Sequence, residues 1–116
     1  MSDESPVLDT LTDITAVSLA KCNLDPREFM MARIAALVAV DASAASYLMN
    51  IPGAVDAGIT LEDVQGVLIA VAPVVGTPRV LSAATRITDA LGFVISVLDE
   101  AQEQAEADGQ LAAASN

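Results

Sequence analysis

Few residues in this sequence are of the types that usually carry out catalysis or bind metals. The 116 residues contain one cysteine, Cys22, and no histidine. An intramolecular disulfide is therefore impossible, a Cys-x-x-Cys pair is absent, and no imidazole is available as a metal ligand or a general base. These counts argue against zinc, iron and copper sites of the common kinds. We expect the protein to use no metal and no cofactor.

A small polar group in the middle of the chain is the first candidate site. Ser43, Ser46 and Asn50 are three and four residues apart, and Tyr47 stands among them. One interpretation is a helix N-cap followed by small polar residues on a helix flank. The other is a pocket that binds a small molecule through hydroxyls and an amide, with Tyr47 as an acid of pKa about 10. With no histidine and no nearby lysine, neither serine has an evident base to activate it.

Four further residues could take part in chemistry. Arg33 intrudes near an apolar helix face, where it either forms a buried or interface ion pair or binds an anion. Asp41 and Asp56 are the only carboxylates close to the serines in sequence, and burial of either would raise its pKa toward that of a base. Cys22 is either a structural cysteine at a helix end or the thiolate of a single-cysteine peroxidase.

The charge of the chain excludes several classes of partner. The formal net charge is −11, and the five basic residues are scattered, so no basic patch could neutralise phosphates. We expect no nucleic acid and no membrane as partners. The first residues lack the pattern of a signal peptide, and apolar runs are broken before the roughly 18 residues that a membrane helix needs. These features predict a soluble cytoplasmic protein.

Apolar residues recur at helical spacing and predict an all-α domain of about five to six helices. The clearest starts are Asp25-Pro26 with Glu28 and Thr60 with Asp63, each of which can form a capping box. Glycines at 58 and 76 can end helices. Pro52 predicts a kink or two short helices. Because 53% of residues are hydrophobic, more than one small core needs, we expect apolar faces between subunits of a homo-oligomer.

We divide the chain into three segments. Residues 1–22 form a frayed start and a helix from Pro6 to Lys21, which we expect to pack as a lid on the rest. Residues 23–101 form the helical domain. Residues 102–116 form an acidic tail, and we expect fraying from about Gln102 and disorder from Gly109, because acidic residues gather where the helix dipole disfavours anions.

One pair of segments resembles a known family. Asp-Ala-Gly-Ile-Thr-Leu-Glu-Asp-Val at 56–64, followed one helix later by Val-Gly-Thr-Pro-Arg-Val-Leu at 75–81, resembles the carboxymuconolactone decarboxylase and alkyl hydroperoxidase D-like (AhpD-like) superfamily. The similarity runs from about Leu24 to Gly92. It implies an oligomeric AhpD-like helical domain, with trimers or hexamers favoured over dimers.

The resemblance also implies where an active site would lie. Redox members carry a Cys-x-x-Cys-x-x-x-His segment on the helix that ends in Ala-Gly, and a glutamate on the preceding helix. Counted back from Gly58, the cysteines fall on Ser43 and Ser46, the histidine on Asn50, and the glutamate on Met30 or Met31. Each of these residue types is replaced in this sequence.

Three functions follow for this chain. The first is a catalytically degenerate member of the family that acts as a structural or small-molecule-binding oligomer, with Arg33, Ser46, Tyr47 and Asn50 as candidate ligand-binding residues. The second is a decarboxylase-type enzyme that acts on a small lactone or keto acid through non-thiol residues. The third is a peroxidase that reduces hydroperoxides through Cys22.

Overall fold

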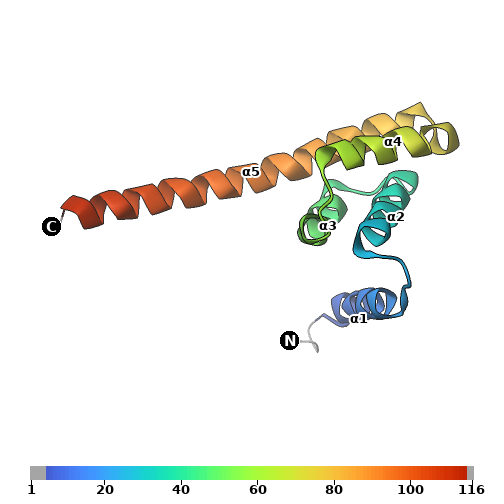
Figure 1. The fold of residues 1–116 in the computed structure, drawn as a ribbon, viewed down its shortest axis with the longest axis horizontal. Coiled ribbons are helices and arrows are strands. Elements are labelled where there is room, and N and C mark those ends of the chain that lie inside the picture. The colour runs from blue at the N-terminus through green and yellow to red at the C-terminus, as the bar shows by residue number, and fades with distance from the viewer. Residues whose placement is uncertain (1–4, 115–116) are drawn as a thin grey trace.

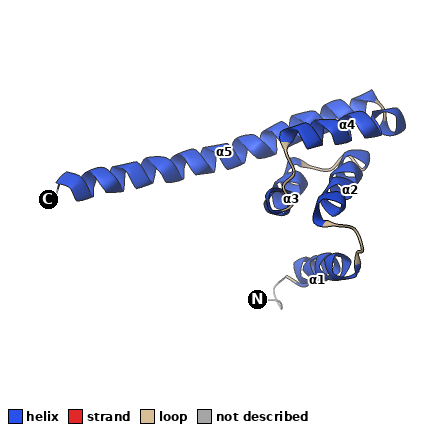
Figure 2. Ribbon diagram, in the orientation of Figure 1, coloured by secondary structure: helices blue, strands red, loops and turns tan. Residues whose placement is uncertain are grey.

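The chain folds into helices only. The computed structural model describes residues 5–114, and over them five helices and no strand are formed (Figures 1 and 2). The helices are α1 (Pro6–Lys21), α2 (Pro26–Ala39), α3 (Ala44–Asp56), α4 (Leu61–Val75) and α5 (Thr77–Ala114). The predicted fold class and number of helices are therefore confirmed. Residues 1–4 of the predicted frayed start and the last two of the predicted tail lie outside the described residues.

Two capping boxes fix where α2 and α4 begin. The Asp25 carboxylate accepts a hydrogen bond from the Glu28 amide at 2.9 Å, and the Glu28 carboxylate accepts one from the Asp25 amide at 3.2 Å. Thr60 and Asp63 exchange the same pair of bonds at 3.0 and 2.9 Å. Each box satisfies amide groups that no helical carbonyl can reach. Both predicted starts are thus confirmed.

The turns between helices use positive backbone angles. Gly58 and Gly76 have φ of +75° and +89°, as expected of glycines that end helices, and Asp41 adopts +56° after α2. Pro52 lies inside a continuous α3, so two separate short helices do not form. Because Pro52 lies in the second half of α3, its missing amide removes only one hydrogen bond near the helix end.

Four helices enclose the core, which lies between α2, α3, α4 and the first half of α5. Helix α4 runs beside α5, and α3 lies below the middle of α5 (Figure 1). Val38 of α2, Tyr47 of α3, and Ala83 and Ala90 of α5 form the buried cluster. The two alanines allow α3 and α5 to approach closely, which brings the centre of α3 against α5.

Three arginines fasten the helix ends to this bundle. Arg27 donates to the Gly58 carbonyl at 2.8 Å and makes two bonds of 3.0 Å to the Asp63 carboxylate. Arg79 donates to the Ala39 carbonyl at 2.8 Å, and Arg86 donates to the carbonyls of residues 41 and 42. These carbonyls lie at the last residue of α2 or just after α2 and α3, where the helix dipole is negative and the backbone lacks helical partners.

Helix α1 stands apart from the bundle. None of its residues is buried, and none of its Cα atoms lies within 8 Å of another helix. Its large apolar side chains are half exposed or more, from Val17 at 53% to Val7 at 70%. The predicted bounds of this helix are confirmed, but it does not pack as a lid. Figure 1 shows it below α2, joined by the connection at residues 22–25.

Helix α5 leaves the bundle after about Leu91 and continues to Ala114 without contact with another helix (Figure 1). Fraying from Gln102 was predicted, and the helix instead persists. Side-chain bonds one turn apart support it, from Gln102 to Glu106 at 3.2 Å and from Gln104 to Asp108 at 2.9 Å. Alanine, glutamate and glutamine are also strong helix formers.

By length and mean hydropathy, α5 is the one described helix that could cross a membrane. The span is Thr77–Gln110, and 11% of its most apolar window is buried in the protein. Core helices of soluble proteins meet the same criterion. The part of α5 that carries Arg86 belongs to the bundle, since Arg86 is bonded to the α2–α3 connection.

Candidate functional site

The three polar residues predicted on α3 do lie together, but they satisfy one another. Ser43 is the N-cap of α3, and its hydroxyl accepts a bond from the Ser46 amide at 3.3 Å and lies 3.3 Å from the Ser46 hydroxyl. The Asn50 amide donates to the Ser46 carbonyl at 2.8 Å. Within the described residues no carboxylate, lysine or arginine bonds to either serine hydroxyl. This face therefore caps a helix and holds no activated nucleophile.

Tyr47 lies beside these residues on α3 and points toward the core. Its side chain packs with Val38, Ala83 and Ala90, and the residue is only 6% exposed. The hydroxyl is buried and has no hydrogen-bond partner. Burial raises the pKa of this phenol above 10.0; the charge of Asp41 adds to the rise, and Arg86 opposes it. Tyr47 is therefore a neutral donor without an acceptor.

An apolar cavity of about 110 Å³ adjoins Tyr47. It lies between α3, the start of α4 and the middle of α5. Its lining is almost entirely hydrocarbon, with Asn50 as the other polar residue, and includes Ile34, Ile51, Val64, Ile87 and Leu91. An engineered cavity of about 150 Å³ accommodates benzene, so a single small ring would fill this smaller cavity and extend into its open side. Val55 and Leu61, also in the lining, are 68% and 64% exposed and mark its open side.

Arg33 occupies a second, larger cleft between α1, α2 and α3. Its guanidinium carbon lies 4.5 Å from the centre of the Phe29 ring, a cation–π arrangement. Among the described residues Arg33 forms no ion pair, which is unlike the predicted buried pair. Asn50 and Asp56 line the same cleft, so Asn50 borders both hollows.

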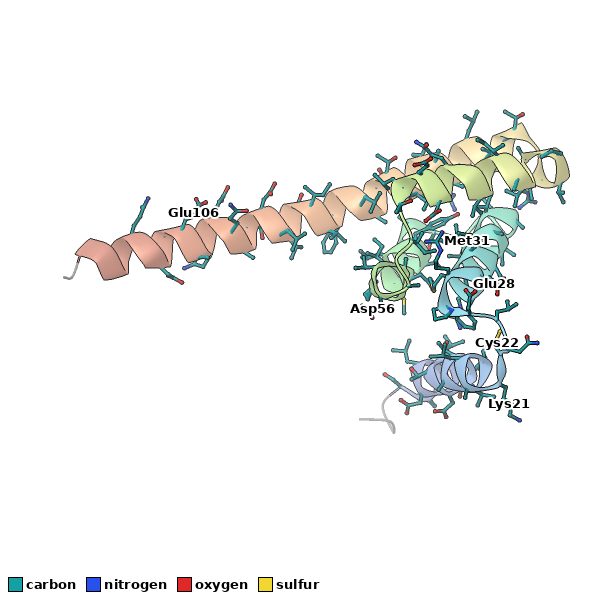
Figure 3. The ribbon with its side chains drawn as sticks, viewed as in Figure 1. Lys21, Cys22, Glu28, Met31, Asp56 and Glu106 are labelled. Atoms are coloured by element: carbon teal, nitrogen blue, oxygen red, sulfur yellow. The ribbon has the colours of Figure 1, made fainter. Side chains whose placement is uncertain are left out.

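Met30 and Met31 are the two residues that correspond to the family's glutamate, and they face different helices. Met30 is 5% exposed, and its sulfur would lie 3.4 Å from a Cβ built on Gly53, so it faces α3. Met31 lies toward α4 (Figure 3). Of the two, only Met30 shares a cleft with Asn50. Its thioether can neither give nor take a proton there.

Asp41 and Cys22 lie away from the cavity. The Asp41 carboxylate accepts a bond from the Ser82 hydroxyl at 2.7 Å and lies 3.5 Å from Arg86, so it holds the α2–α3 connection against α5. Cys22 ends α1, and Figure 3 places it at the α1–α2 connection, apart from Asp56 at the end of α3. Sequence reasoning missed the structural role of Arg86, because its partners are about 45 residues away in the chain.

Comparison with known proteins identifies the family. Residues 6–90 match the family model of the carboxymuconolactone decarboxylase family. The chain belongs to the carboxymuconolactone decarboxylase family. The match includes α1 and ends one residue before Leu91, where α5 leaves the bundle. Comparisons with curated proteins and with solved structures gave no match.

Proposed function

We propose that this carboxymuconolactone decarboxylase family protein is a non-redox homo-oligomer that binds one small, mostly apolar molecule in the cavity beside Tyr47. The observation that carries the proposal is the buried Tyr47 hydroxyl without a partner at the wall of an apolar cavity. A buried donor left without an acceptor costs about 1–3 kcal/mol. A ligand oxygen that reaches this hydroxyl would remove that cost.

The ligand class follows from the lining. Hydrocarbon surface on nearly every side favours a compact apolar body of about one ring. Tyr47 and Asn50 favour one oxygen on that body, because a neutral phenol donates a hydrogen bond. No charged side chain lines this cavity, so an ionised group would be buried without a partner there. Arg33 and Ser46, the other candidates, lie outside the cavity lining.

The experiment compares phenol with toluene, two rings of similar size that differ in one oxygen. By calorimetric titration we expect both to bind and phenol to bind about 2- to 10-fold more tightly, since one hydrogen bond contributes about 0.5–1.5 kcal/mol. In Tyr47→Phe the two affinities should become equal. Ala54→Leu, which fills the cavity, should weaken both, and Ala45→Leu on the exposed side of α3 should weaken neither.

Two results would contradict the proposed ligand site. If the unchanged protein binds neither compound, or if Ala54→Leu binds both as well as the unchanged protein does, the cavity is not a ligand site. Native mass spectrometry of the protein purified from its source gives a second readout. A stoichiometric mass that leaves on denaturation identifies the natural ligand.

A decarboxylase-type enzyme remains the second candidate, and the cleft at Arg33 favours it. Arg33 has no acidic partner among the described residues and shares this cleft with Asn50 and Asp56, so a small carboxylate could bind there. Turnover of a lactone acid or keto acid that is lost in Arg33→Gln and Asp56→Asn would support it. For a peroxidase, equal peroxide consumption by the unchanged protein and Cys22→Ser would exclude a role for the thiol.

A further inference from the structure

The outer half of α5 carries an apolar stripe that is partly buried at Leu91 and Val94 and exposed from Leu98 outward. From the bundle outward, Leu91, Val94, Leu98, Ala101 and Ala105 recur at steps of three and four, so they share one face of the helix. Leu98 is 62% exposed, and the flanking Ile95 and Val97 are 57% and 47% exposed. The stripe continues the face with which Ile87 contacts the core.

Charge is kept away from this stripe. Asp99, Glu100 and Glu103 project from the opposite side of the helix, Glu106 lies on its flank beside Gln102, and the flanking positions 102 and 104 are glutamines. Figure 3 labels Glu106 on the upper side of α5, away from α3. Only Asp108, beyond the end of the stripe, approaches it. A partner therefore needs no positive charge, and an identical acidic helix can approach without repulsion at the contact.

The surface area fits a second copy of the chain. The protomer exposes 8160 Å², whereas a compact protein of 11.9 kDa exposes about 6,000 Å². Both α1 and the outer half of α5 contribute to this excess of about 2,000 Å², which is of the size that a chain buries in a permanent homodimer.

We infer that two copies pair through the outer halves of α5, antiparallel, with the helices crossing near Leu98. The stripe is bulky near the bundle, at Leu91, Val94 and Leu98, and small farther out, at Ala101 and Ala105. Antiparallel pairing places the small residues of one helix against the large residues of the other and keeps the helix spacing even. Parallel pairing would leave a gap along the alanines.

Antiparallel pairing also brings the second copy beside the cavity. With the crossing near Leu98, Ala105 of the second copy lies beside Leu91, which lines the cavity. A second copy would thus extend the cavity wall at Leu91. This last step rests on the proposed ligand-binding function, whereas the pairing itself does not.

The interface is tested with two matched substitutions on α5. Leu98 and Leu81 are 62% and 63% exposed, but Leu81 lies on the bundle half and off the stripe. By native mass spectrometry we expect the full chain to form particles with an even number of subunits. Leu98→Asp should shift them to half the mass or less while the circular dichroism spectrum stays helical, and Leu81→Asp should preserve the pair. A trimer, or pairing that survives Leu98→Asp, would overturn the inference.

Direction is tested with spin labels in a Cys22→Ser background. Cysteines placed singly at Ser96 and Gln110 lie on the outer side of α5, two heptads apart. Antiparallel pairing predicts distances between copies of about 25 Å at 96 and about 40 Å at 110, from a rise of 1.5 Å per residue. Equal distances at the two positions would show parallel pairing and refute the inferred geometry.

Two further readouts separate the remaining outcomes. If phenol binds, Leu98→Asp should lower the affinity for phenol at least 3-fold, and Leu81→Asp should not lower it. If phenol binds neither the unchanged protein nor the variants, the proposed function fails, and the mass and distance measurements still decide whether the chains pair. If the unchanged chain is monomeric and floats with phosphatidylcholine vesicles, and Leu98→Asp abolishes this flotation, then the stripe binds a membrane and the inference is overturned.

Discussion

The two halves of α5 have the same secondary structure for different reasons. From Thr77 to Leu91 the helix is held by tertiary contacts, with Ala83 and Ala90 only 2% and 3% exposed and Arg86 bonded across to the α2–α3 connection. From Gly92 to Ala114 the helix extends away from the other described helices (Figure 1). The first half is specified by long-range packing, and the second by local propensity and an unfilled stripe. A continuous helix can therefore join a rigid part of a protein to a part whose partner lies outside the protomer.

The largest expected difference between the halves comes from a buried charge. Ala83→Asp places a carboxylate between α3 and α5, and we expect it to lower the free energy of unfolding by about 3 kcal/mol or more. Ala107→Asp makes the same change on the exposed outer half and should cost about 0.5 kcal/mol or less. Urea denaturation followed by circular dichroism measures both. Equal effects would show that the outer half is buried in the same way as the bundle.

Glycine substitutions sharpen the comparison at the junction. A Cβ at Gly92 or Gly109 would meet no atom within 4 Å, so alanine fits at both positions. We expect Gly92→Ala to stabilise the folded protein by about 1 kcal/mol, the usual gain of alanine over glycine inside a helix. Gly109→Ala should raise helix content without changing the main unfolding transition. A Gly109→Ala gain as large as that at Gly92 would indicate that both halves unfold together.

Low pH should lower the stability of the bundle but not that of the outer half of α5. The Arg27 guanidinium beside Asp63 holds the pKa of that carboxyl down from 3.8 to about 2. Because the folded state binds this proton less readily, its contribution to stability is present above pH about 4 and is lost as the pH falls through 2. The thermal midpoint of Asp63→Asn should depend less on pH in this window than that of Glu62→Gln. In the outer half, protonation removes acidic charge from the helix C-terminus, where the dipole disfavours it.

Alkali gives the smallest effect, and it reports on the bundle alone. The phenol of Tyr47 has a pKa raised above 10.0, chiefly by burial. Its neutral form is favoured in the folded state, so this contribution to stability is complete below pH 10 and is lost as the pH rises through the folded pKa. Tyr47 is the only tyrosine, and there is no tryptophan, so ultraviolet absorbance follows this group without interference. Ionisation with an ordinary pKa in the intact fold would mean that the hydroxyl is solvated.

Local signals in the sequence predicted much of the fold. Capping residues such as Asp25 and Thr60, and the glycines at 58 and 76, fix helix ends through bonds between residues close in the chain, so sequence alone reveals them. The bounds of α1 were predicted from apolar residues at helical spacing, since no side chain caps its start. Its separation from the bundle was not, because an apolar face in a sequence does not indicate whether its partner lies in the same protomer.

The candidate site was predicted only in part. Ser43, Ser46 and Asn50 share one face because their spacing is helical, and this much is visible in the sequence. The cavity beside Tyr47 is lined by Ile34, Val64 and Leu91 from three other helices, and no local sequence pattern indicates that these residues come together. The helical tail was not predicted, because its support comes from side-chain bonds of Gln102 and Gln104 to acidic residues one turn on, which offset the unfavourable dipole at the helix end.

The one-sided placement of acid on α5 has a consequence for how the protein behaves in solution. With a sequence pI of about 4.1, the chain loses its net charge in mildly acidic conditions. Net charge then no longer keeps neighbouring particles apart, and paired helices could stack along their outer surfaces. The same row of acids that leaves the apolar side free for a partner would thus limit association beyond it at neutral pH, and precipitation near the isoelectric point would mark its loss.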